Sequence, residues 1–388
     1  MRRALTSLAV CLALTATSCT GSEGQPPAPE PVEVAWEYVD LPQPPGPTGR
    51  VAVRDAVSCD GTWWLVGGVF GADGESFPAG WRSDDAGLTW STLRFTPRGY
   101  WAERAVLASV ACQGERVVMV GAKSGGAHGN PRVATWYQAA DGRFLDVVAP
   151  FSLYGGDQAV SVGRVVAGPG GWLIAGNRTA GAAVWVASND QDFELIDDDP
   201  ALIRDAQLDT LAIDQVHDGT EWTVVGAGHV EGRVNGVPLA WVSPDGRRWT
   251  RQQVPTTDAY ADLERVVATD DGLLALGLRG EAFGTWRRID GRWRATEDFG
   301  AADPDGLAFR GISGLVTDGD DALAAVADGT SYSLWATLGG DPWAPVEVPV
   351  SPEAAGEQVL TVAAADGTVL LLADDAQKGR MWRAAWPQ

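Results

Sequence analysis

The chain has 388 residues and a formal net charge of −22 at pH 7, which argues against nucleic acids and anionic membrane surfaces as partners. Hydrophobic residues make up 45% of the chain and 18 residues are tryptophan, enough for a sizeable buried core. Length alone would suggest two or three domains, but an internal repeat favours one closed domain instead.

The first 18 residues have the pattern of an export signal. Two arginines precede an apolar stretch, 4–17, that is too short to span a bilayer. The sequence Ala-Thr-Ser-Cys at 16–19 then resembles the lipobox of bacterial lipoproteins, with alanine where leucine is usual. This resemblance implies that residues 1–18 are removed and that Cys19 is lipidated. Ordinary secretion with cleavage nearby is the alternative.

A flexible tether is expected over residues 19–33. Its Gly, Ser, Glu, Gln and Pro residues show no apolar periodicity, and a segment of this composition stays solvated. No later stretch reaches the ~18 apolar residues that a spanning helix needs. We therefore expect the protein on the extracytoplasmic face of the cell membrane, attached to it only through the lipid.

Most of the chain is built from seven similar units. Each unit has a short apolar strand, a tight turn, a stronger apolar strand, a third strand with a tryptophan and a fourth strand that opens with an aromatic residue. The marker tryptophans recur at roughly 50 residues, a period typical of propellers, solenoids and arrays. They are Trp81, Trp136, Trp185, Trp241, Trp286, Trp335 and Trp382.

Four strands in each of seven units predict an all-β, seven-bladed propeller over residues 34–388. Asp-Gly and Gly-Gly pairs suit two-residue hairpin turns, because glycine accepts positive φ at low cost. Continuous apolar runs fit strands that are covered on both faces. The seventh unit ends too early for a fourth strand, and residues 36–42 have the character of the fourth strand at 249–255. We therefore expect the N-terminal strand to complete the last blade and close the ring.

Residues 83–90 read Ser-Asp-Asp-Ala-Gly-Leu-Thr-Trp and match the Asp-box, S-x-D-x-G-x-T-W, position for position. This bacterial neuraminidase repeat lies between the third and fourth strands of sialidase-like propellers, which the chain therefore resembles. Its side-chain oxygens can satisfy backbone donors of the hairpin while the glycine takes a strained φ. The box is thus interpreted as a folding device and not as a catalytic motif. Its residues are Ser83, Asp85, Gly87, Thr89 and Trp90.

For an active sialidase the resemblance implies an arginine triad, a Tyr-Glu nucleophile pair and an acidic aspartate. The Arg-Ile-Pro motif that usually supplies the first arginine is absent, and the region between the export signal and the first blade offers only Arg50 and Arg54. A protein without catalytic activity is therefore favoured. A sialidase-like or other glycoside hydrolase that acts on extracellular glycans is the alternative.

Ligand contacts are expected on the face opposite the Asp-box turns, because function tends to lie in loops on a rigid scaffold. The adjacent aromatics Tyr100 and Trp101, beside Arg98, could stack a sugar ring or anchor a peptide. A loop tucked over the blade edge is the alternative. Further candidates in the loops are Tyr154, Arg178 and Tyr260. The expected partner is a glycan or a cell-envelope protein.

The cysteines and histidines limit the cross-links and cofactors. Cys59 and Cys112 hold equivalent positions just before the turn of successive units, which invites a disulfide between two blades; two buried thiols are the alternative. No metal site is expected from the three histidines, which show no ligand spacing. The stretches 303–306 and 318–321 faintly resemble calcium loops without the terminal glutamate, so a structural calcium ion is the only cofactor considered.

Overall fold

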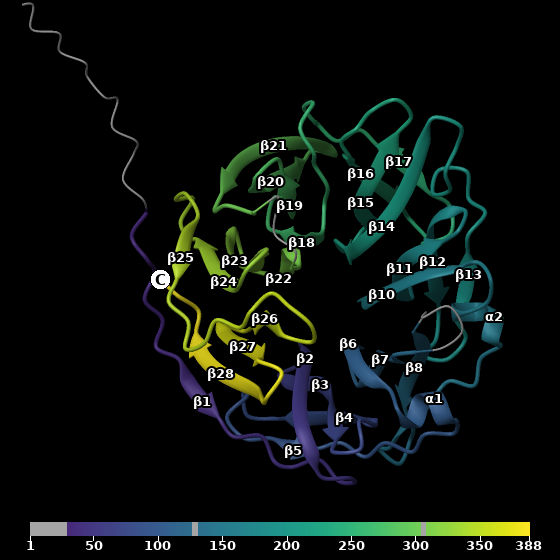
Figure 1. Cartoon of the computed structure of the whole chain (residues 1–388), viewed down its shortest axis with the longest axis vertical. Helices are drawn as coiled ribbons and strands as arrows, with labels where there is room; N and C mark the ends of the chain where they lie inside the picture. The colour runs from purple at the N-terminus through teal and green to yellow at the C-terminus, as the bar shows by residue number, and fades with distance from the viewer. Residues whose placement is uncertain (1–28, 126–130, 304–307) are drawn as a thin grey trace, which may run out of the picture.

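Seven four-stranded antiparallel sheets surround a central channel (Figure 1). The computed structural model describes residues 29–125, 131–303 and 308–388. Each sheet is one blade, so the predicted seven-bladed propeller is confirmed. No helix among the residues described is long and apolar enough to cross a membrane.

In blades 1 to 4 the strands follow one another along the chain, and the first strand of each blade lies next to the channel. Blade 1 contains β2 (Gly49–Cys59), β3 (Thr62–Gly71), β4 (Ser76–Ser83) and β5 (Ser91–Thr92). Blade 2 contains β6 (Val106–Gln113), β7 (Arg116–Lys123), β8 (Arg132–Gln138) and β9 (Phe144–Asp146). Blade 3 contains β10 (Ala159–Gly168), β11 (Gly171–Arg178), β12 (Gly181–Ala187) and β13 (Glu194–Ile196). Blade 4 contains β14 (Leu208–His217), β15 (Trp222–Val230), β16 (Val237–Ser243) and β17 (Thr250–Gln252).

Blades 5 and 6 keep the same order, and two short helices lie in the connections on either side of blade 2. Blade 5 contains β18 (Arg265–Thr269), β19 (Gly272–Arg279), β20 (Ala282–Ile289) and β21 (Arg292–Phe299). Blade 6 contains β22 (Arg310–Asp318), β23 (Asp321–Asp328), β24 (Tyr332–Thr337) and β25 (Ala344–Val346). Blade 7 contains β26 (Val359–Ala365), β27 (Thr368–Asp374), β28 (Gly379–Ala385) and, from the start of the chain, β1 (Glu37–Val39). The helices are α1 (Tyr100–Glu103) and α2 (Phe151–Tyr154).

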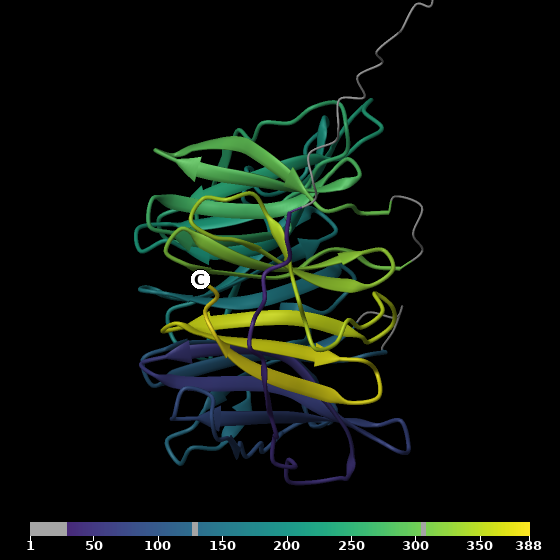
Figure 2. The same ribbon diagram turned by 90° about the vertical axis from the view of Figure 1, so that its left-hand side faces the viewer.

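The ring is closed by the N-terminal segment, as the sequence predicts. Strand β1 pairs antiparallel with β28, with Tyr38 opposite Trp382. Before β1, the segment also follows the outer edge of blade 6, where Val32 bridges Val346 in parallel. Figure 2 shows this segment crossing the outside of the last two blades. The two outer edges that it covers are therefore unavailable for pairing with another chain.

The tight turns carry the residues that their geometry requires. Three hairpin turns, at 60–61, 290–291 and 366–367, have the sequence Asp-Gly with positive φ at both residues. This is the turn conformation whose twist matches that of the flanking strands. The Asp-Gly pair is therefore the feature that identifies these three hairpins in the sequence.

The marker tryptophans pack between blades and also fix the connections. Five of the seven are fully buried. Four donate an indole N–H, at 2.7–3.2 Å, to a carbonyl of the connection that enters their own blade: Trp81 to Pro42, Trp185 to Leu153, Trp241 to Ala201 and Trp286 to Pro255. A buried indole needs such an acceptor. One residue type thus serves both the core and the path of the chain.

The innermost strands are joined to one another by side chains, and each of the seven interfaces between blades has such a contact. In most of them a side chain accepts a backbone N–H of the next blade or bonds a backbone carbonyl there. The contacts are Val110 N to Asp55, Val165 N to Ser109, Gln215 to Arg164 O, Val266 N to Asp214, Ile312 N to Glu264 and Ser313 to Leu360 O. The seventh interface, between blades 7 and 1, instead places Asp374 against Arg50 and Arg54 at 2.7 and 2.6 Å.

A disulfide joins Cys59 to Cys112, with the Cα atoms 6.0 Å apart. The two cysteines are offset by one position and are not strictly equivalent. Cys59 pairs with Thr62 directly beside its turn, whereas Cys112 pairs with Val117, one residue further into the hairpin. Because successive side chains of a strand point to opposite faces, this offset turns the two thiols toward each other.

The ion pairs of Asp374 predict a large loss of stability when its charge is removed. Its side chain is fully buried and bonds two arginines, so Asp374→Asn removes the carboxylate that pairs with Arg54 and leaves Arg50 paired with Glu357 alone. We expect the free energy of unfolding, measured by urea denaturation, to fall by about 3–5 kcal/mol. Asp157→Asn changes an exposed aspartate and should alter it by less than about 0.5 kcal/mol. Equal effects of the two substitutions would contradict this role for Asp374.

Candidate binding sites on the face opposite the Asp-box turns

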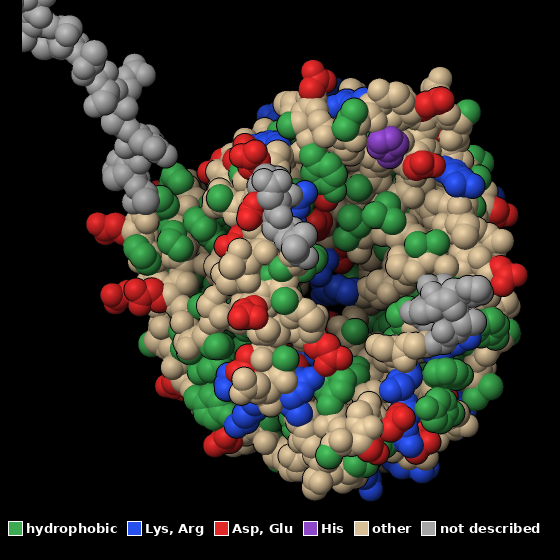
Figure 3. All heavy atoms as spheres, viewed as in Figure 1, with side chains coloured by type: hydrophobic (Ala, Val, Ile, Leu, Met, Phe, Trp, Pro, Cys, Tyr) green, Lys and Arg blue, Asp and Glu red, His purple; other side chains and the backbone are tan. Residues whose placement is uncertain are grey.

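The blades are linked to each other by connections on one face, and α1 and α2 both lie in such connections. A groove with a volume of about 360 Å³ opens between the two helices and the start of β8. We call it the blade-2 groove; Arg98, Trp101, Arg132, Val148, Phe151 and Tyr154 line it. Figure 3 shows hydrophobic and basic side chains side by side on this face, over α1.

Arg132 is the central cation of the blade-2 groove. Its guanidinium lies over the rings of Phe151, at 4.4 Å from the centroid, and of Trp101, at 5.5 Å. The side chain is half-buried. It has no salt bridge or side-chain hydrogen bond to any residue in the described part of the chain, and its Nε is buried without an acceptor. A cation held between two aromatic rings with its N–H donors unused is arranged to receive an anionic or polar group.

Three further sequence candidates lie at this groove in different roles. Tyr100 is 53% exposed and contacts the ring of Trp101 edge to face at 5.1 Å. Arg98 is held by Asp146, which accepts its backbone N–H at 2.6 Å and lies 3.7 Å from its guanidinium. Tyr154 is buried, and burial raises the pKa of its phenol, whose O–H donates to Thr135. Tyr100 is thus open to a ligand, whereas Tyr154 forms the floor of the groove.

The remaining two candidates do not line the blade-2 groove. Arg178 is buried beneath α2, where it donates to the carbonyl of Gly155 at 3.0 Å and lies 3.7 Å from Asp197. It holds the end of α2 in place and does not face the groove. Tyr260 lies near the channel, in the segment that leads into β18, and donates to Asp262 at 2.9 Å. The sequence therefore grouped residues that the fold separates.

Three residues that line the groove, Arg132, Val148 and Phe151, are not among the residues that the sequence suggests. Arg132 opens β8, and Phe151 lies in the blade 2–3 connection, the counterpart of the connection that holds Tyr100 and Trp101. That equivalence was the only signal for Phe151. Arg132 gave none, since its contacts come from two separate connections.

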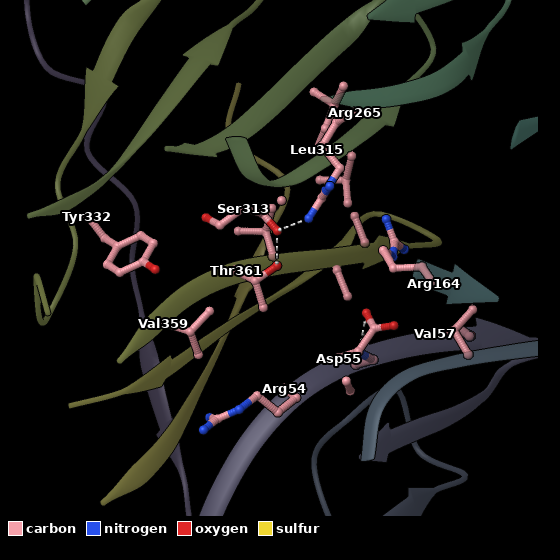
Figure 4. Close-up of a pocket in the computed structure, with 18 of the residues that line it drawn as sticks. Arg54, Asp55, Val57, Arg164, Arg265, Ser313, Leu315, Tyr332, Val359 and Thr361 are labelled. Carbon is pink, nitrogen blue, oxygen red and sulfur yellow. Dashed lines mark hydrogen bonds between the residues drawn. The ribbon is translucent and has the colours of Figure 1, made fainter. Parts of the chain in front are cut away.

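The central channel holds a second cavity, of about 430 Å³. Strand pairing gives each innermost strand one equivalent position facing this region: Asp55, Ser109, Arg164, Asp214, Arg265, Gly314 and Thr361. Figure 4 shows Arg164 above Asp55, with Arg265 extending toward Ser313. In Figure 3 the channel is a hollow with Lys or Arg side chains at its floor. Charged residues of both signs therefore meet in the channel.

A pair of carboxyl groups, on Asp262 and Glu264, lies where blade 5 meets blade 6. Asp262 accepts the Tyr260 O–H and the backbone N–H of Leu278, and Glu264 accepts the N–H of Ile312. Burial and then the charge of Asp262 raise the pKa of Glu264 to about 8. Burial is also the main cause that raises the pKa of the Tyr260 phenol. The pair thus keeps a proton at neutral pH.

The Asp-box residues form a closed hydrogen-bond set within their turn. Ser83 Oγ accepts the N–H of Gly87 at 3.0 Å, and Asp85 accepts both the N–H and the O–H of Thr89, at 2.8 and 2.6 Å. The bonds from Thr89, followed by that from Ser83, lower the pKa of Asp85 to about 2. Gly87 has φ of +80° and the Trp90 indole donates to its carbonyl. Every polar group of the box is occupied within the turn.

Some residues of the expected calcium and lipid sites lie outside the described part of the chain. In the described ranges, no three His, Cys, Asp or Glu side chains lie close enough together to hold a metal ion. Residues 304–306 of one calcium-like stretch lie outside the described residues. So does Cys19, the predicted lipid attachment site.

No protein-family model matches the sequence. No curated protein matches it either.

Solved structures resemble the chain in fold. The propeller domain of the Trilobed protease from Pyrococcus furiosus has a TM-score of 0.51 at 10% identity, over 87% of this chain and 96% of that one. A prolyl endopeptidase has a TM-score of 0.51 at 12% identity, over 86% of this chain and 50% of its own. A Trypanosoma rangeli sialidase mutant with trans-sialidase activity has a TM-score of 0.45 at 11% identity, over 92% of this chain. The chain spans 60% of the length of that sialidase. The chain therefore belongs structurally with β-propellers, and the similarity extends to the fold alone.

The Asp262–Glu264 pair predicts that stability depends on pH. The pKa of Glu264 is raised from the ordinary value of 4.5 to about 8 in the folded protein. The contribution of this group to stability is therefore fully present below about pH 4.5, where it is protonated in both the folded and the unfolded state. Stability should then fall as pH rises toward and through 8. Glu264→Gln keeps an acceptor for Ile312 and removes the titration, so its free energy of unfolding should vary less with pH. Urea denaturation at pH 5, 6.5 and 8 tests this, and parallel curves for both proteins would contradict it.

Proposed function

We propose that this protein is a non-catalytic binding module of the bacterial cell envelope whose ligand is a glycan held in the blade-2 groove. The observation that supports this most is the position of Arg132, which lies between Trp101 and Phe151 and makes no salt bridge or side-chain hydrogen bond to a described residue. Aromatic rings offer flat apolar surface to a sugar ring, and a guanidinium supplies directed donors to its oxygens. Groove, aromatic rings and cation thus form one recognition surface.

Two tyrosines among the sequence candidates, Tyr154 and Tyr260, are poorly suited to act as a nucleophile. A nucleophile needs a lowered pKa or an adjacent base that takes its proton. Tyr260 does have a carboxylate neighbour, Asp262, but burial and this negative charge raise the phenol pKa. Tyr154 is buried, which also raises its pKa. For these reasons we favour binding over the glycoside hydrolase alternative.

A protein partner is the second candidate, favoured by the apolar side chains beside the groove. Val148 is 74% exposed and Phe151 61%, next to Trp101 at 42%. Exposed apolar side chains that lie together are typical of protein interaction sites. An envelope protein that inserts an acidic side chain toward Arg132 would use the same groove.

Anchoring through Cys19 is the part of the proposal that rests on the lipobox resemblance. Lipidated wild-type protein should sediment with the membrane fraction and partition into detergent, because acyl chains bury in the bilayer. Cys19→Ser removes the acceptor thiol and should move most of the protein into the soluble fraction. Equal partitioning of both proteins would contradict lipidation at this residue.

The glycan proposal predicts how groove variants bind. Wild-type protein on a glycan array should select a small set of glycans. Trp101→Ala and Arg132→Met should each weaken that binding by about tenfold, because loss of a ring or cation contact costs ~1–2 kcal/mol. Titration calorimetry with the selected glycan measures the change.

The control is Arg294→Met, which removes an exposed arginine from the outer strand of blade 5. It should bind as the wild type does, and circular dichroism should show all variants folded. Selective binding that survives both groove substitutions would exclude the groove as the glycan site. Absence of any glycan binding by folded protein would exclude the glycan proposal and leave the envelope-protein partner, to be sought by cross-linking from Phe151.

A further inference from the structure

Charges in the channel are not required by the propeller fold. At the equivalent position of the innermost strands, three blades carry the uncharged residues Ser109, Gly314 and Thr361. Their innermost strands pair with the second strands as in the other blades. The remaining four carry two arginines and two aspartates. The aspartates have a structural role, since Asp55 and Asp214 each accept an N–H of the next blade. The arginines need a separate explanation.

The hydrogen-bond donors of Arg164 are unused. Its side chain is 38% exposed in the channel and forms an ion pair with Asp214 at 3.7 Å, too long for a hydrogen bond, and its guanidinium makes no hydrogen bond to a residue in the described part of the chain. Arg265 donates to the carbonyls of Glu264 and Ser313, and its Nε is buried without a partner. Buried polar groups are normally hydrogen-bonded. Both guanidinium groups therefore have donors to offer in the same cavity.

Two carboxylates lie close to Arg164, and they differ in how far their oxygens are occupied: Asp214 Oδ1 is buried and has no hydrogen-bond partner among the described residues. Asp55 accepts the N–H groups of Ala56 and Val110, one on each oxygen. Of Asp214, one oxygen accepts from Val266, and the other lies toward Arg164 in a side chain that is 1% exposed. Of these two carboxylates, Asp55 lines the cavity with a hydrogen bond on each oxygen, whereas Asp214 is not one of the lining residues. Burial is the main cause that lowers the pKa of Arg265; attraction to Asp214 opposes this shift, and repulsion from Arg164 adds to it with a smaller effect.

We propose that the channel cavity binds a small tetrahedral oxyanion, either free phosphate or the phosphate group of a small ester, between Arg164 and Arg265. Two guanidinium groups from different blades approach from different directions (Figure 4). A tetrahedral anion offers three or four oxygens that point apart, so it can accept from both groups at once. A carboxylate has two coplanar oxygens, which one guanidinium fork already occupies. The cavity volume of about 430 Å³ leaves space for an ester substituent.

Asp55 lies next to this site and opposes an anion. Its carboxylate is near Arg164, and burial raises its pKa above the ordinary value. Binding of an anion should favour its protonated form further. Removal of the Asp55 charge should therefore strengthen anion binding, whereas removal of a nearby arginine charge should weaken it.

The test is titration calorimetry of the purified full chain with inorganic phosphate and with glycerol phosphate, with acetate as the carboxylate control. Phosphate should bind wild-type protein at least about tenfold more tightly than acetate, and Arg164→Gln should weaken phosphate binding by about tenfold. Asp55→Asn should strengthen it. Arg294→Gln, on the outer strand of blade 5, should leave it unchanged. Tighter binding of glycerol phosphate than of phosphate would identify an ester as the ligand, and the reverse would identify the free ion.

Several outcomes would overturn the proposal. They are the absence of phosphate binding, equal binding of acetate, and equal binding by wild type and folded Arg164→Gln. The Arg164 guanidinium makes no hydrogen bond to a described residue and only a 3.7 Å ion pair with Asp214, so its glutamine variant should keep the fold. If it does not, the Asp55→Asn variant decides: unchanged or weaker phosphate binding there would contradict an anion beside that carboxylate.

Discussion

Contact between the innermost strands is the constraint on which the propeller depends. Apolar packing between blades is non-directional and by itself would not fix how far one blade slides along the next. Side chains with a fixed backbone partner in the neighbouring blade set that register, as Asp214 does for Val266 and Glu264 for Ile312. The interface between blades 7 and 1 uses the stronger contact of Asp374 with two arginines.

This constraint separates structural charges from charges that are free for a ligand. A carboxylate that accepts an N–H of the next blade is committed to the fold, which is true of Asp55 and Asp214. A guanidinium cannot accept a hydrogen bond, so it cannot bond the N–H groups that need partners at these positions. Arg164 therefore remains in the channel with its donors unused. The same reasoning applies outside the channel to Arg132, whose only described side-chain contacts are aromatic.

The sequence predicts the fold well because the fold repeats. The tryptophan period, the Asp-Gly turns and the short last unit each report local structure, and together they predict seven blades closed by the N-terminal strand. The binding sites are not local. Arg132 contacts aromatic rings from two separate connections. Burial raises the pKa of Asp262 and of Glu264, and no sequence pattern predicts that burial. Tyr100 and Trp101 were found because adjacent aromatic residues in one loop are visible in the sequence. Arg178 was also a loop candidate from the sequence, but it is buried beneath α2.

The acidic surface strengthens the case for anionic ligands at these two places. With 51 acidic and 29 basic residues, the chain repels anions over most of its surface. A partly buried arginine in such a protein usually has a carboxylate in hydrogen-bond contact, because an unpaired buried charge is costly. Among the described residues, neither Arg132 nor Arg164 has a carboxylate in hydrogen-bond contact, the Asp214 oxygen being 3.7 Å from Arg164, and each lines a cavity. An anion that reaches either cavity gains a directed partner there that it does not meet on the surrounding surface, so selectivity follows from the scarcity of unpaired cations and not from net charge.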